Sequence, residues 1–509
     1  MIISLSVLVI TIIVSGTYAL YKAQLSKNIG VNTTTHGLAY YINYVKGTDI
    51  TAATLNPSTS YEGGASSDIE FWKKDDSYDI YGKIELTVNT IGTNLSNSPA
   101  LKYAVVNNGN VLKEGSLKGT TSGSKVTILK NLYLEQTKQI YTVYVWLDNS
   151  EELGNISNES LSISVDCTAS LQKEPAADTI ISLYTSAAKV TATNNSITYN
   201  TAPSVSLMND RLGGTTTSLD GGNIRYYGAS PNNYIYFNCS DYSNQTSSTC
   251  ETWRIIGVFD GKLKLIRGSQ IGKYSWDNKN ISTGAEDDRG KNDWTTARLM
   301  KLLNPDDYYI NDNNDKDSEG NYLGYSLYYN SASGMCFTDE GVNYSACDFT
   351  STGIKNDETR NMIAETTYNL GGWNDTGVYP NEIYEYERGT TVYTGRPTTW
   401  TGKIALAYPS DYGYAADLNQ CKQTLANYDN STCTSNNWMK AIITDNGSNH
   451  GWLLTPDSSY SFGAWYSHGN VGEYFTGAAR GAVPVLSLSS KLGIESGDGS
   501  SSNPYKLSA

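Results

Sequence analysis

The chain has 509 residues, of which 37 are basic and 51 acidic, so its formal net charge at neutral pH is −14. This length is that of about three domains, and the acidic balance excludes a broadly basic surface for nucleic acid or anionic lipid. Only 17% of the residues are charged, whereas 40 are Tyr and 46 are Gly. Such a composition is typical of extracellular β-rich proteins and carbohydrate-facing surfaces, and equally of any surface protein from an AT-rich genome.

An uncharged apolar stretch, residues 2–20, occupies most of the first predicted segment, residues 1–21. It is just long enough to span a bilayer as a helix. Two interpretations stay open, an uncleaved transmembrane anchor or a secretory signal peptide cleaved after Ala19. Both export the bulk of the chain. We therefore expect an extracellular protein at the cell surface, either held in the membrane by residues 2–20 or secreted.

Residues 22–170 are predicted to form an antiparallel β-sandwich or jelly roll. Ile80–Val88 and Leu161–Cys167 alternate apolar and polar residues at a period of two, which predicts strands with one buried face. Ala100–Leu117 predicts a hairpin around an Asn-Asn-Gly-Asn turn. Ile140–Leu147 is apolar on both faces and predicts a central strand. No helical period of any length runs through this domain, which favours an all-β fold.

Three motifs near the N-terminus carry a family resemblance: Gly16–Ala19, Lys46–Asp49 and Asp68–Lys73. Together with the apolar N-terminus, they resemble the camelysin-type and biofilm-matrix-fibre proteins of Firmicutes. The aromatic pair that usually follows the alanine in that family is here Leu20-Tyr21. Camelysins have been described as metalloproteases, but the chain contains no His-Glu-x-x-His motif, so we carry over no peptidase activity.

Residues 171–220 are rich in Thr, Ala, Ser, Asn and Gly and are predicted to be a linker with one short helix over Asp178–Tyr184. Residues 221–509 are predicted to form an α+β domain. Its first clear elements are the strands Trp253–Phe259 and Lys262–Arg267, which an Asp-Gly turn joins into a hairpin.

Two helices and a loop-rich series of strands follow in this domain. Trp294–Leu303 and Asp357–Leu370 carry apolar stripes at helical spacing. The domain is organised around Trp452–Leu488, in which short apolar runs alternate with turns rich in Gly, Ser and Asn. Its last run, Ala482–Leu486, predicts a buried strand, and Pro484 places that strand at an edge or a bulge.

This order of elements resembles bacterial C-type-lectin-like domains and the lectin-like fold of formylglycine-generating enzymes. Several stretches are also similar to a lectin-like domain of unknown function that recurs in surface proteins of gut Firmicutes: Trp253–Gly257, Thr359–Met362, Gly395–Trp400, Ser410–Ala415 and Gly497–Pro504. The resemblance implies a C-type-lectin-like domain. It does not extend to formylglycine-type catalysis, which uses cysteines in late loops, because no cysteine follows Cys433.

Six of the seven cysteines fall into local pairs that bracket polar loops: Cys239 with Cys250, Cys336 with Cys347, and Cys421 with Cys433. This spacing favours loop-closing disulfides in an oxidising compartment. Reduced structural thiols and a metal site are the alternatives, and the metal site lacks both a Cys-x-x-Cys spacing and nearby histidines. Cys167 is left over, and its alternation with Ile163 and Val165 predicts a buried free thiol.

Aromatic and charged residues gather in sequence around the predicted strand Lys403–Tyr408, and such a mixture is typical of a sugar or polar-peptide site. Together with Trp465 of the aromatic hairpin Ala464–Tyr466, the candidate ligand contacts are Arg388, Arg396, Trp400, Asp411, Tyr412, Tyr414 and Trp465. The alternative is structural, with Arg396 paired to Asp411 so that the two residues tie loops to the core.

The acidic segment 311–320 carries oxygen-bearing side chains at alternate positions, Asn313, Asp315, Asp317 and Glu319. It resembles a calcium loop but lacks the central glycine and the bidentate Glu at the twelfth position. A solvated acidic loop is the competing interpretation. Structural calcium is thus the one cofactor considered.

These observations favour an adhesin-like cell-surface protein, not an enzyme, whose lectin-like domain binds an extracellular glycan or protein. The alternative is a structural subunit of a surface fibre or biofilm matrix that self-associates through an edge strand of the sandwich. The third hypothesis is an exported hydrolase. Two catalytic acids need not be near in sequence, but nothing in the sequence singles out a pair.

Overall fold

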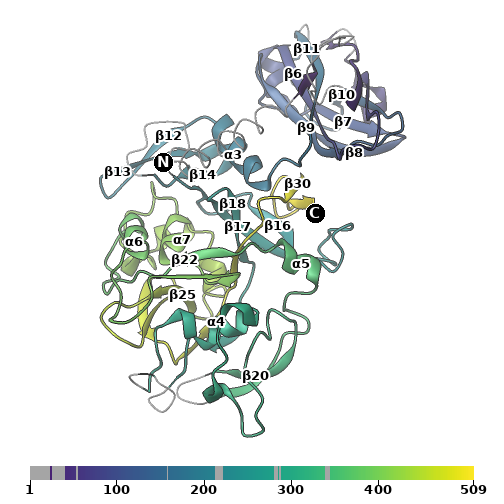
Figure 1. The fold of residues 1–509 in the computed structure, drawn as a ribbon. Helices are drawn as coiled ribbons and strands as arrows, with labels where there is room; N and C mark the ends of the chain where they lie inside the picture. Colours follow the sequence, from purple (N-terminus) through teal and green to yellow (C-terminus); the bar gives the residue numbers. More distant parts are fainter. Residues whose placement is uncertain are drawn as a thin grey trace, which may run out of the picture. The chain divides into compact units, whose positions relative to one another are not determined.

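The chain divides into two compact units, Met1–Glu174 and Pro175–Ala509. Strands dominate both units and most helices lie in the second, which confirms a multidomain, mainly β fold (Figure 1). The computed structural model describes residues 23–25, 41–52, 55–156, 159–211, 222–279, 285, 288–338 and 344–508.

The first unit is a β-sandwich of two mainly antiparallel sheets. One sheet has the order β1-β11-β6-β9, with β3 also beside β11; its strands are β1 (Ala23–Leu25), β3 (Ile50–Thr51), β6 (Tyr81–Ile91), β9 (Lys125–Tyr133) and β11 (Leu161–Ser170). The other has the order β2-β5-β10-β7-β8, with β4 also beside β10; its strands are β2 (Ile42–Val45), β4 (Pro57–Ser58), β5 (Ala65–Lys73), β7 (Leu101–Asn107), β8 (Asn110–Ser116) and β10 (Ile140–Asp148). Two short helical turns, η3 (Tyr61–Gly63) and α2 (Thr93–Asn97), lie in connections.

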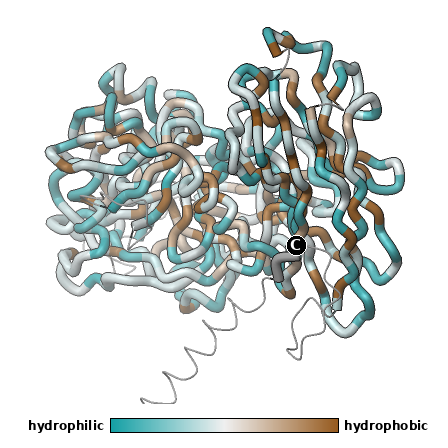
Figure 2. The backbone as a smooth tube through the Cα atoms, turned by 90° about the horizontal axis from the view of Figure 1, so that it is seen from above, coloured by the Kyte–Doolittle hydropathy of each residue, from teal (hydrophilic) through white to brown (hydrophobic). Residues whose placement is uncertain are grey.

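Alternation along the strands builds the core of the sandwich. Ile84, Leu86 and Val88 of β6 are fully buried and belong to one cluster with Phe71 of β5 and Val143 of β10. Figure 2 shows brown hydrophobic and teal hydrophilic positions alternating along such strands. Because successive side chains of a strand point to opposite faces, this pattern buries one face of each sheet against the other.

The predicted elements of the first unit are confirmed. Strands β7 and β8 form the expected hairpin, with Asn108 and Gly109 at φ values of 49° and 77° in its turn. Positive φ at both turn positions matches the twist of a two-residue hairpin. Strand β10 is central, because it pairs with β5 on one side and β7 on the other. Cys167 of β11 is a free, fully buried thiol, as its alternation predicts.

The second unit contains a nine-stranded sheet with the order β12-β13-β14-β15-β17-β18-β29-β24, with β16 also beside β17. Its strands are β12 (Val190–Asn194), β13 (Ile197–Ala202), β14 (Leu207–Asn209), β15 (Ile224–Tyr226), β16 (Tyr234–Phe237), β17 (Glu251–Phe259), β18 (Lys262–Arg267), β24 (Ile404–Ala405) and β29 (Val485–Ser487). Strands β17 and β18 form the predicted hairpin, with Asp260 and Gly261 at positive φ in the turn.

The segment expected to be a linker, residues 171–220, differs from that expectation. Helix α3 (Ala176–Ser186) and strands β12, β13 and β14 occupy most of it, and all belong to the second unit. Ile180 and Tyr184 of α3 are fully buried in the core of that unit. The predicted short helix is therefore present, but it packs against the sheet. The small polar residues of this segment suggested a linker, but their backbone forms paired strands that extend the sheet.

A five-stranded sheet has the order β19-β28-β25-β26-β27; its strands are β19 (Lys273–Ser275), β25 (Gly451–Pro456), β26 (Gly463–Ser467), β27 (Val471–Phe475) and β28 (Ala479–Gly481). Three two-stranded ribbons accompany it: β20 (Ser333–Phe337) with β21 (Tyr344–Asp348), β22 (Thr366–Asn369) with β23 (Thr399–Gly402), and β30 (Gly493–Ser496) with β31 (Lys506–Ser508). The remaining described helices are η4 (Pro203–Val205), η6 (Trp294–Thr296), α4 (Arg298–Leu303), η7 (Asp306–Tyr308), η8 (Asn313–Asp315), α5 (Asp357–Met362), α6 (Pro380–Glu387), α7 (Pro409–Tyr414), η9 (Leu425–Asn427), α8 (Ser431–Ser435) and α9 (Lys440–Ile443).

Both predicted helices are shorter than expected. The first divides into η6 and α4, and the second ends at Met362, after which Thr366–Asn369 forms β22. The apolar residues beyond Met362 therefore lie in β22 and in the residues on either side of it. Tyr368 of β22 contacts the core ring of Trp400 at a centroid distance of 5.6 Å, so tertiary packing sets the conformation there.

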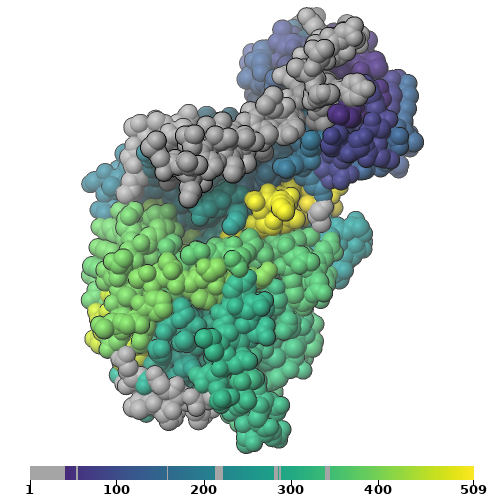
Figure 3. Space-filling model, viewed as in Figure 1, coloured from purple at the N-terminus to yellow at the C-terminus, as the bar shows by residue number. Residues whose placement is uncertain are grey.

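The stretch Trp452–Leu488 forms short strands that end in the buried strand β29, as expected. Trp452, Leu453, Leu454 and Trp465 are all fully buried. On the face in Figure 3 the coloured surface of the second unit is mainly teal and green, with smaller yellow areas from the C-terminal part of the chain. The position predicted for Pro484 is wrong, because β29 lies between β18 and β24 rather than at an edge. Proline is accommodated because it precedes the strand and removes no N–H from the ladder.

Three disulfides join the predicted cysteine pairs, so the pairing is confirmed: Cys239 with Cys250, Cys336 with Cys347, and Cys421 with Cys433. Such bonds indicate an extracellular or otherwise oxidising environment. Residues 2–20, the predicted anchor or signal, lie outside the described residues. Within the described part of the chain, no helix has the length and apolar character needed to cross a bilayer.

Candidate functional site

A cluster of aromatic and cationic side chains lies on the five-stranded sheet of the second unit. All of its members come from the strands of this sheet or from the residues beside them. We call it the cationic aromatic cluster, and it consists of Lys273, His450, Tyr466, His468, Tyr474 and Arg480.

The register of the sheet brings these residues together. Tyr466 of β26 stands opposite Trp452 of β25 on one side and Gly472 of β27 on the other. A Cβ atom at Gly472 would lie only 3.0 Å from the ring of Tyr466, so glycine leaves the room that this ring occupies. His450 and His468 directly flank the paired residues Gly451 and Ser467, which places the two imidazoles at the same end of the strands.

Arg480 is the centre of the cluster. Its Cζ atom lies 3.8 Å from the ring centroid of Tyr466 and 4.4 Å from that of Tyr474. Its Nη1 group contacts Nδ1 of His450, whose ring stacks on Tyr466 at a centroid distance of 5.2 Å and an angle of 14°. The ring of His468 lies 4.6 Å from that of His450. Aromatic faces thus hold the guanidinium in place.

The charge of Arg480 has no acidic partner among the described residues. It is only 8% exposed, yet its Nε atom has no hydrogen-bond partner, and none of the described ion pairs includes a member of the cluster. Burial lowers the pKa of Arg480. The pKa of His450 is also lowered, first by burial and then by the positive charges of Arg480, His468 and Lys273. The cluster is therefore electropositive within an acidic chain.

Two carboxyl groups lie elsewhere on the same sheet. Asp457, which follows β25, is fully buried; its Oδ1 accepts from the backbone N of Ser459 and Tyr460, while its Oδ2 has no donor. Burial, a hydrogen bond with Asp457 and the charges of Asp457 and Asp375 raise the pKa of Glu473 to about 8. The protonated form of Glu473 is therefore the form that its surroundings favour.

Five of the predicted ligand contacts lie in the core instead of on an accessible surface. They have exposed fractions of 7% or less: Trp400, Asp411, Tyr412, Tyr414 and Trp465. The Tyr412 hydroxyl donates to the carbonyl of Gly469 at 2.6 Å, and the Trp465 indole donates to that of Trp373 at 3.1 Å. Their polar atoms are thus used within the protein.

Asp411 and Tyr414 meet in a buried ion-pair network. Asp411 accepts from Arg225 Nη1 at 2.9 Å and from Lys264 Nζ at 2.5 Å, and Arg225 also bonds Asp210. Arg225 Cζ lies 4.7 Å from the Tyr414 ring. Burial would raise the pKa of Asp411, but Lys264 and Arg225 outweigh it and hold that pKa below its ordinary value.

The two predicted arginines are also tied to the protein. Arg388 lies over the Tyr384 ring at 3.5 Å and bonds Glu387 at 3.2 Å. Arg396 donates from Nε to Asn292 at 2.9 Å and from Nη2 to the Ser461 carbonyl at 3.1 Å. Asp411 pairs with Arg225 and Lys264, so the alternative pairing of Arg396 with Asp411 is wrong.

The predicted calcium residues are not arranged around one point. Asp315 is fully buried and accepts from Arg298 at 3.0 Å and Lys301 at 2.7 Å, so protein cations already occupy its oxygens. Asp317 accepts from the backbone of Glu319 and of Asn321 within its own turn. Asn313 begins η8 and is exposed, as is Glu319. Within the described residues, no group of three or more His, Cys, Asp or Glu gathers to hold a metal ion.

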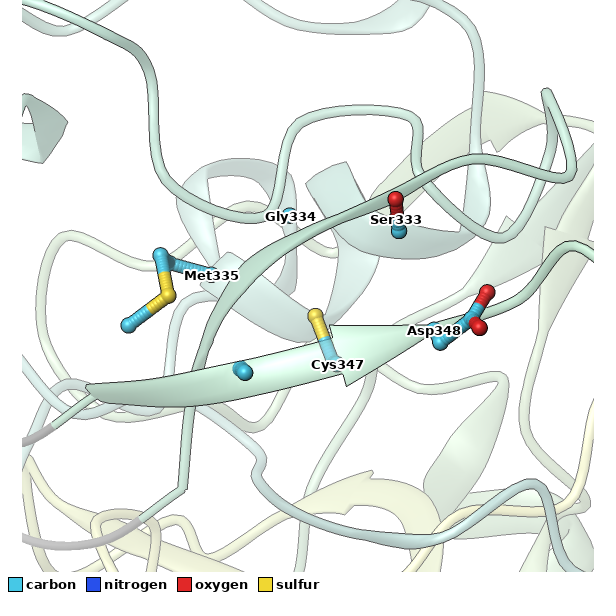
Figure 4. Close-up of a pocket in the computed structure, with 6 residues that line it drawn as sticks. Ser333, Gly334, Met335, Cys347 and Asp348 are labelled. Atoms are coloured by element: carbon cyan, nitrogen blue, oxygen red, sulfur yellow. The ribbon is translucent and has the colours of Figure 1, made fainter.

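An open hollow of about 420 Å³ lies on the β20–β21 ribbon (Figure 4). Its one charged lining residue, Asp348, accepts from the backbone N and hydroxyl of Thr350 at 2.9 and 2.7 Å. Cys347 is held in a disulfide. Ser333 is the other polar side chain of the lining, so the described lining offers few polar groups to fix a ligand.

Sequence reasoning missed both the cationic aromatic cluster and the Asp457–Glu473 pair. Arg480 and Lys273 stand far apart in the chain, and only the register of β19 with β28 brings their strands together. One signal was available. The chain has three histidines, of which His450 lies just before the stretch Trp452–Leu488 and His468 lies within it.

Comparisons with known proteins leave the family of this chain open. No family model matches it, and no curated protein matches it. Among solved structures, the chain is similar to the crystal structure of a mutant of HCR/D, at 12% identity over 51% of this chain and 76% of that chain. The TM-score of this match is 0.17, which carries no information about the fold or the function.

Proposed function

We propose that this chain is an exported cell-surface protein whose second unit binds an extracellular glycan or protein through the cationic aromatic cluster. The observation that carries the proposal is the cluster itself, in which Tyr474 is 42% exposed and both histidines are exposed beside Arg480. Exposed aromatic rings next to hydrogen-bonding cations are what a polar extracellular ligand requires. The three disulfides support export.

The proposal also keeps two expectations from the sequence. Residues 2–20 would hold the protein in the membrane or direct its secretion. The second unit would be a C-type-lectin-like domain, on the resemblance of its sequence motifs and element order. The pairs β17–β18 and β25–β26, joined through short helices and loops, support such an α+β arrangement.

The test is binding of the full-length, oxidised protein to a combined array of glycans and extracellular-matrix proteins. We expect saturable binding that falls at least tenfold in Tyr474→Ala and in His468→Ala. The matched control is Tyr460→Ala, which removes a tyrosine that is 53% exposed but packs on Phe462, outside the cluster. Binding that survives both cluster variants unchanged would contradict the proposed site.

A second candidate function is a structural subunit of a surface fibre, and one observation favours it. Strand β8 ends its sheet, and its Val111 and Leu112 are 43% and 40% exposed. An unpaired edge strand with exposed apolar side chains can accept a strand from another copy. Concentration-dependent polymers, seen by light scattering and abolished by Val111→Lys but not by Tyr78→Lys, would support this function. Tyr78 is equally exposed but lies outside the strands.

A further inference from the structure

Arg480 is a buried cation whose surroundings, among the described residues, supply aromatic faces and further positive charge but no carboxylate. Its Nη1 group is taken by His450, while Nε is buried without a partner. A buried guanidinium is normally paired, because desolvation of an uncompensated charge is costly. Among the described residues, Arg225, Arg267 and Arg298 each have a carboxylate within 3.1 Å. Arg254, which is also 8% exposed, has no described carboxylate partner, but its Nε donates to Asn233 Oδ1 at 2.5 Å, whereas Nε of Arg480 has no described partner.

The positively charged neighbours of Arg480 make the lack of a described carboxylate partner more costly in free energy. His468 and Lys273 lie near Arg480, and the pKa of His450 is lowered first by burial and then by Arg480 together with these two residues, which favours its neutral form. The chain has 51 acidic and 37 basic residues, so carboxylates that could pair with Arg480 are abundant in the sequence. Because none of the described carboxylates pairs with this electropositive cluster, the cluster suits negative charge from outside the chain.

We propose that Arg480, with His450, His468 and Lys273, forms a subsite for the single oxyanion group of an acidic polysaccharide. This inference rests on the proposed function and names its ligand class. The edge of the guanidinium away from His450 would bind a carboxylate or sulfate, because its donors are fixed in a planar fork. The rings of Tyr466 and Tyr474 would contact the apolar face of the sugar that carries the group.

A net charge of −14 repels every polyanion at long range, so the local positive charge of the cluster, and not the charge of the whole chain, favours an anionic ligand. An acidic peptide could supply a carboxylate, but its flexible side chain offers no planar apolar face to Tyr474, which is 42% exposed. The observations therefore favour a uronate-type polysaccharide.

The experiment measures binding of the full-length, oxidised protein by calorimetry to polygalacturonate and to its fully methyl-esterified form, which is matched in sugar and neutral. Dextran sulfate separates sulfate from carboxylate as the source of the oxyanion, and polyglutamate tests acidic peptides. We expect polygalacturonate to bind at least tenfold more tightly than its ester. Equal binding of the two polymers, or preference for polyglutamate, would overturn the inference.

The decisive variant is Arg480→Gln, for which we expect at least a tenfold loss for polygalacturonate and little change for the ester. The control is Arg360→Gln, because Arg360 also lies over a tyrosine ring but is paired with Asp357 at 2.7 Å. If Arg480→Gln does not fold, as judged by its melting curve, the exposed-residue variants Lys273→Gln and His468→Gln replace it, each with an expected loss of about threefold.

The two proposals fail in different ways. Binding of a neutral glycan or a matrix protein that is lost in Tyr474→Ala but unaffected by Arg480→Gln would overturn the oxyanion subsite and leave the proposed function standing. A folded protein that binds nothing on the array and no polymer would overturn both.

Discussion

Lys264 Nζ lies 2.5 Å from Asp411 Oδ2, and both side chains are buried in the second unit. Arg225 completes the network from the other side of the carboxylate, at 2.9 Å. Asp411 had the features of a ligand contact in the sequence, an acid among tyrosines. In the structure it neutralises two buried cations that otherwise have too little negative charge around them.

We expect Asp411→Asn to lower the free energy of unfolding by about 3–5 kcal/mol, because it leaves Lys264 and Arg225 buried with one carboxylate fewer. Urea denaturation followed by tryptophan fluorescence measures this loss. The control, Asp307→Asn, removes an exposed carboxylate and should leave the midpoint unchanged. A midpoint for Asp411→Asn equal to that of the control would show that the network contributes nothing to stability.

The features that could be predicted from the sequence are those set by residues that are close together in the chain. The strands of the first unit and the three disulfides could be predicted, since alternation acts between neighbours and each disulfide closes a loop of 11 or 12 residues. The partners of Asp411 stand 147 and 186 residues away, so no local pattern distinguishes a buried ion pair from a ligand contact. The same holds for Arg480, whose isolation from carboxylates is a property of the folded sheet.

Trp400 shows a related limit. Its indole is 7% exposed and packs edge-on against Trp294 at a centroid distance of 6.2 Å. A large aromatic ring serves a core and a sugar site equally well, and only burial separates the two roles. Small polar residues led to the opposite error. The Thr- and Asn-rich segment of β12 and β13 was predicted to be a linker, but it forms paired strands.

The cysteines predict a thiol count. In the native, oxidised protein no thiol should react with Ellman's reagent, because Cys167 is fully buried and burial raises the pKa of its thiol. In denaturant without reductant, one thiol per chain should react, and peptide mapping should place it at Cys167. Three thiols or more under these conditions would show that at least one of the three disulfides is absent.

The structure of the acidic segment around Asp315 predicts that the stability of the protein does not depend on calcium. Because Arg298 and Lys301 already occupy the oxygens of Asp315, removing calcium with a chelator should shift the melting temperature by less than about 1 °C. Asp315→Asn should lower the free energy of unfolding by about 3–5 kcal/mol with or without calcium. A smaller loss is expected for the control Asp317→Asn, whose carboxylate serves only its own turn. If calcium stabilises the wild type and this effect disappears in Asp315→Asn, the result would support the calcium loop predicted from the sequence.

Glu473 predicts how stability depends on pH. Glu473 lies at an exposed position of β27, but partial desolvation and the interaction with Asp457 raise its pKa in the folded protein from 4.5 to about 8, so the folded state holds this proton more tightly than the unfolded state does. A group of this kind stabilises the fold fully below pH 4.5, and its contribution is lost as the pH rises towards 8. Ionisation then sets two adjacent carboxylates against each other.

Glu473→Gln keeps the hydrogen bond to Asp457 and cannot ionise, so it should remove this part of the pH dependence. We expect its melting temperature to match that of the wild type near pH 4.5 and to exceed it increasingly up to pH 8, where the wild-type pair carries two charges. Calorimetric melting at a series of pH values measures the difference between the two proteins. Glu495→Gln, which changes an exposed carboxyl outside the five-stranded sheet, should show a difference that does not vary with pH. If the Glu473→Gln difference is equally flat, the pKa of Glu473 is not raised in the folded protein.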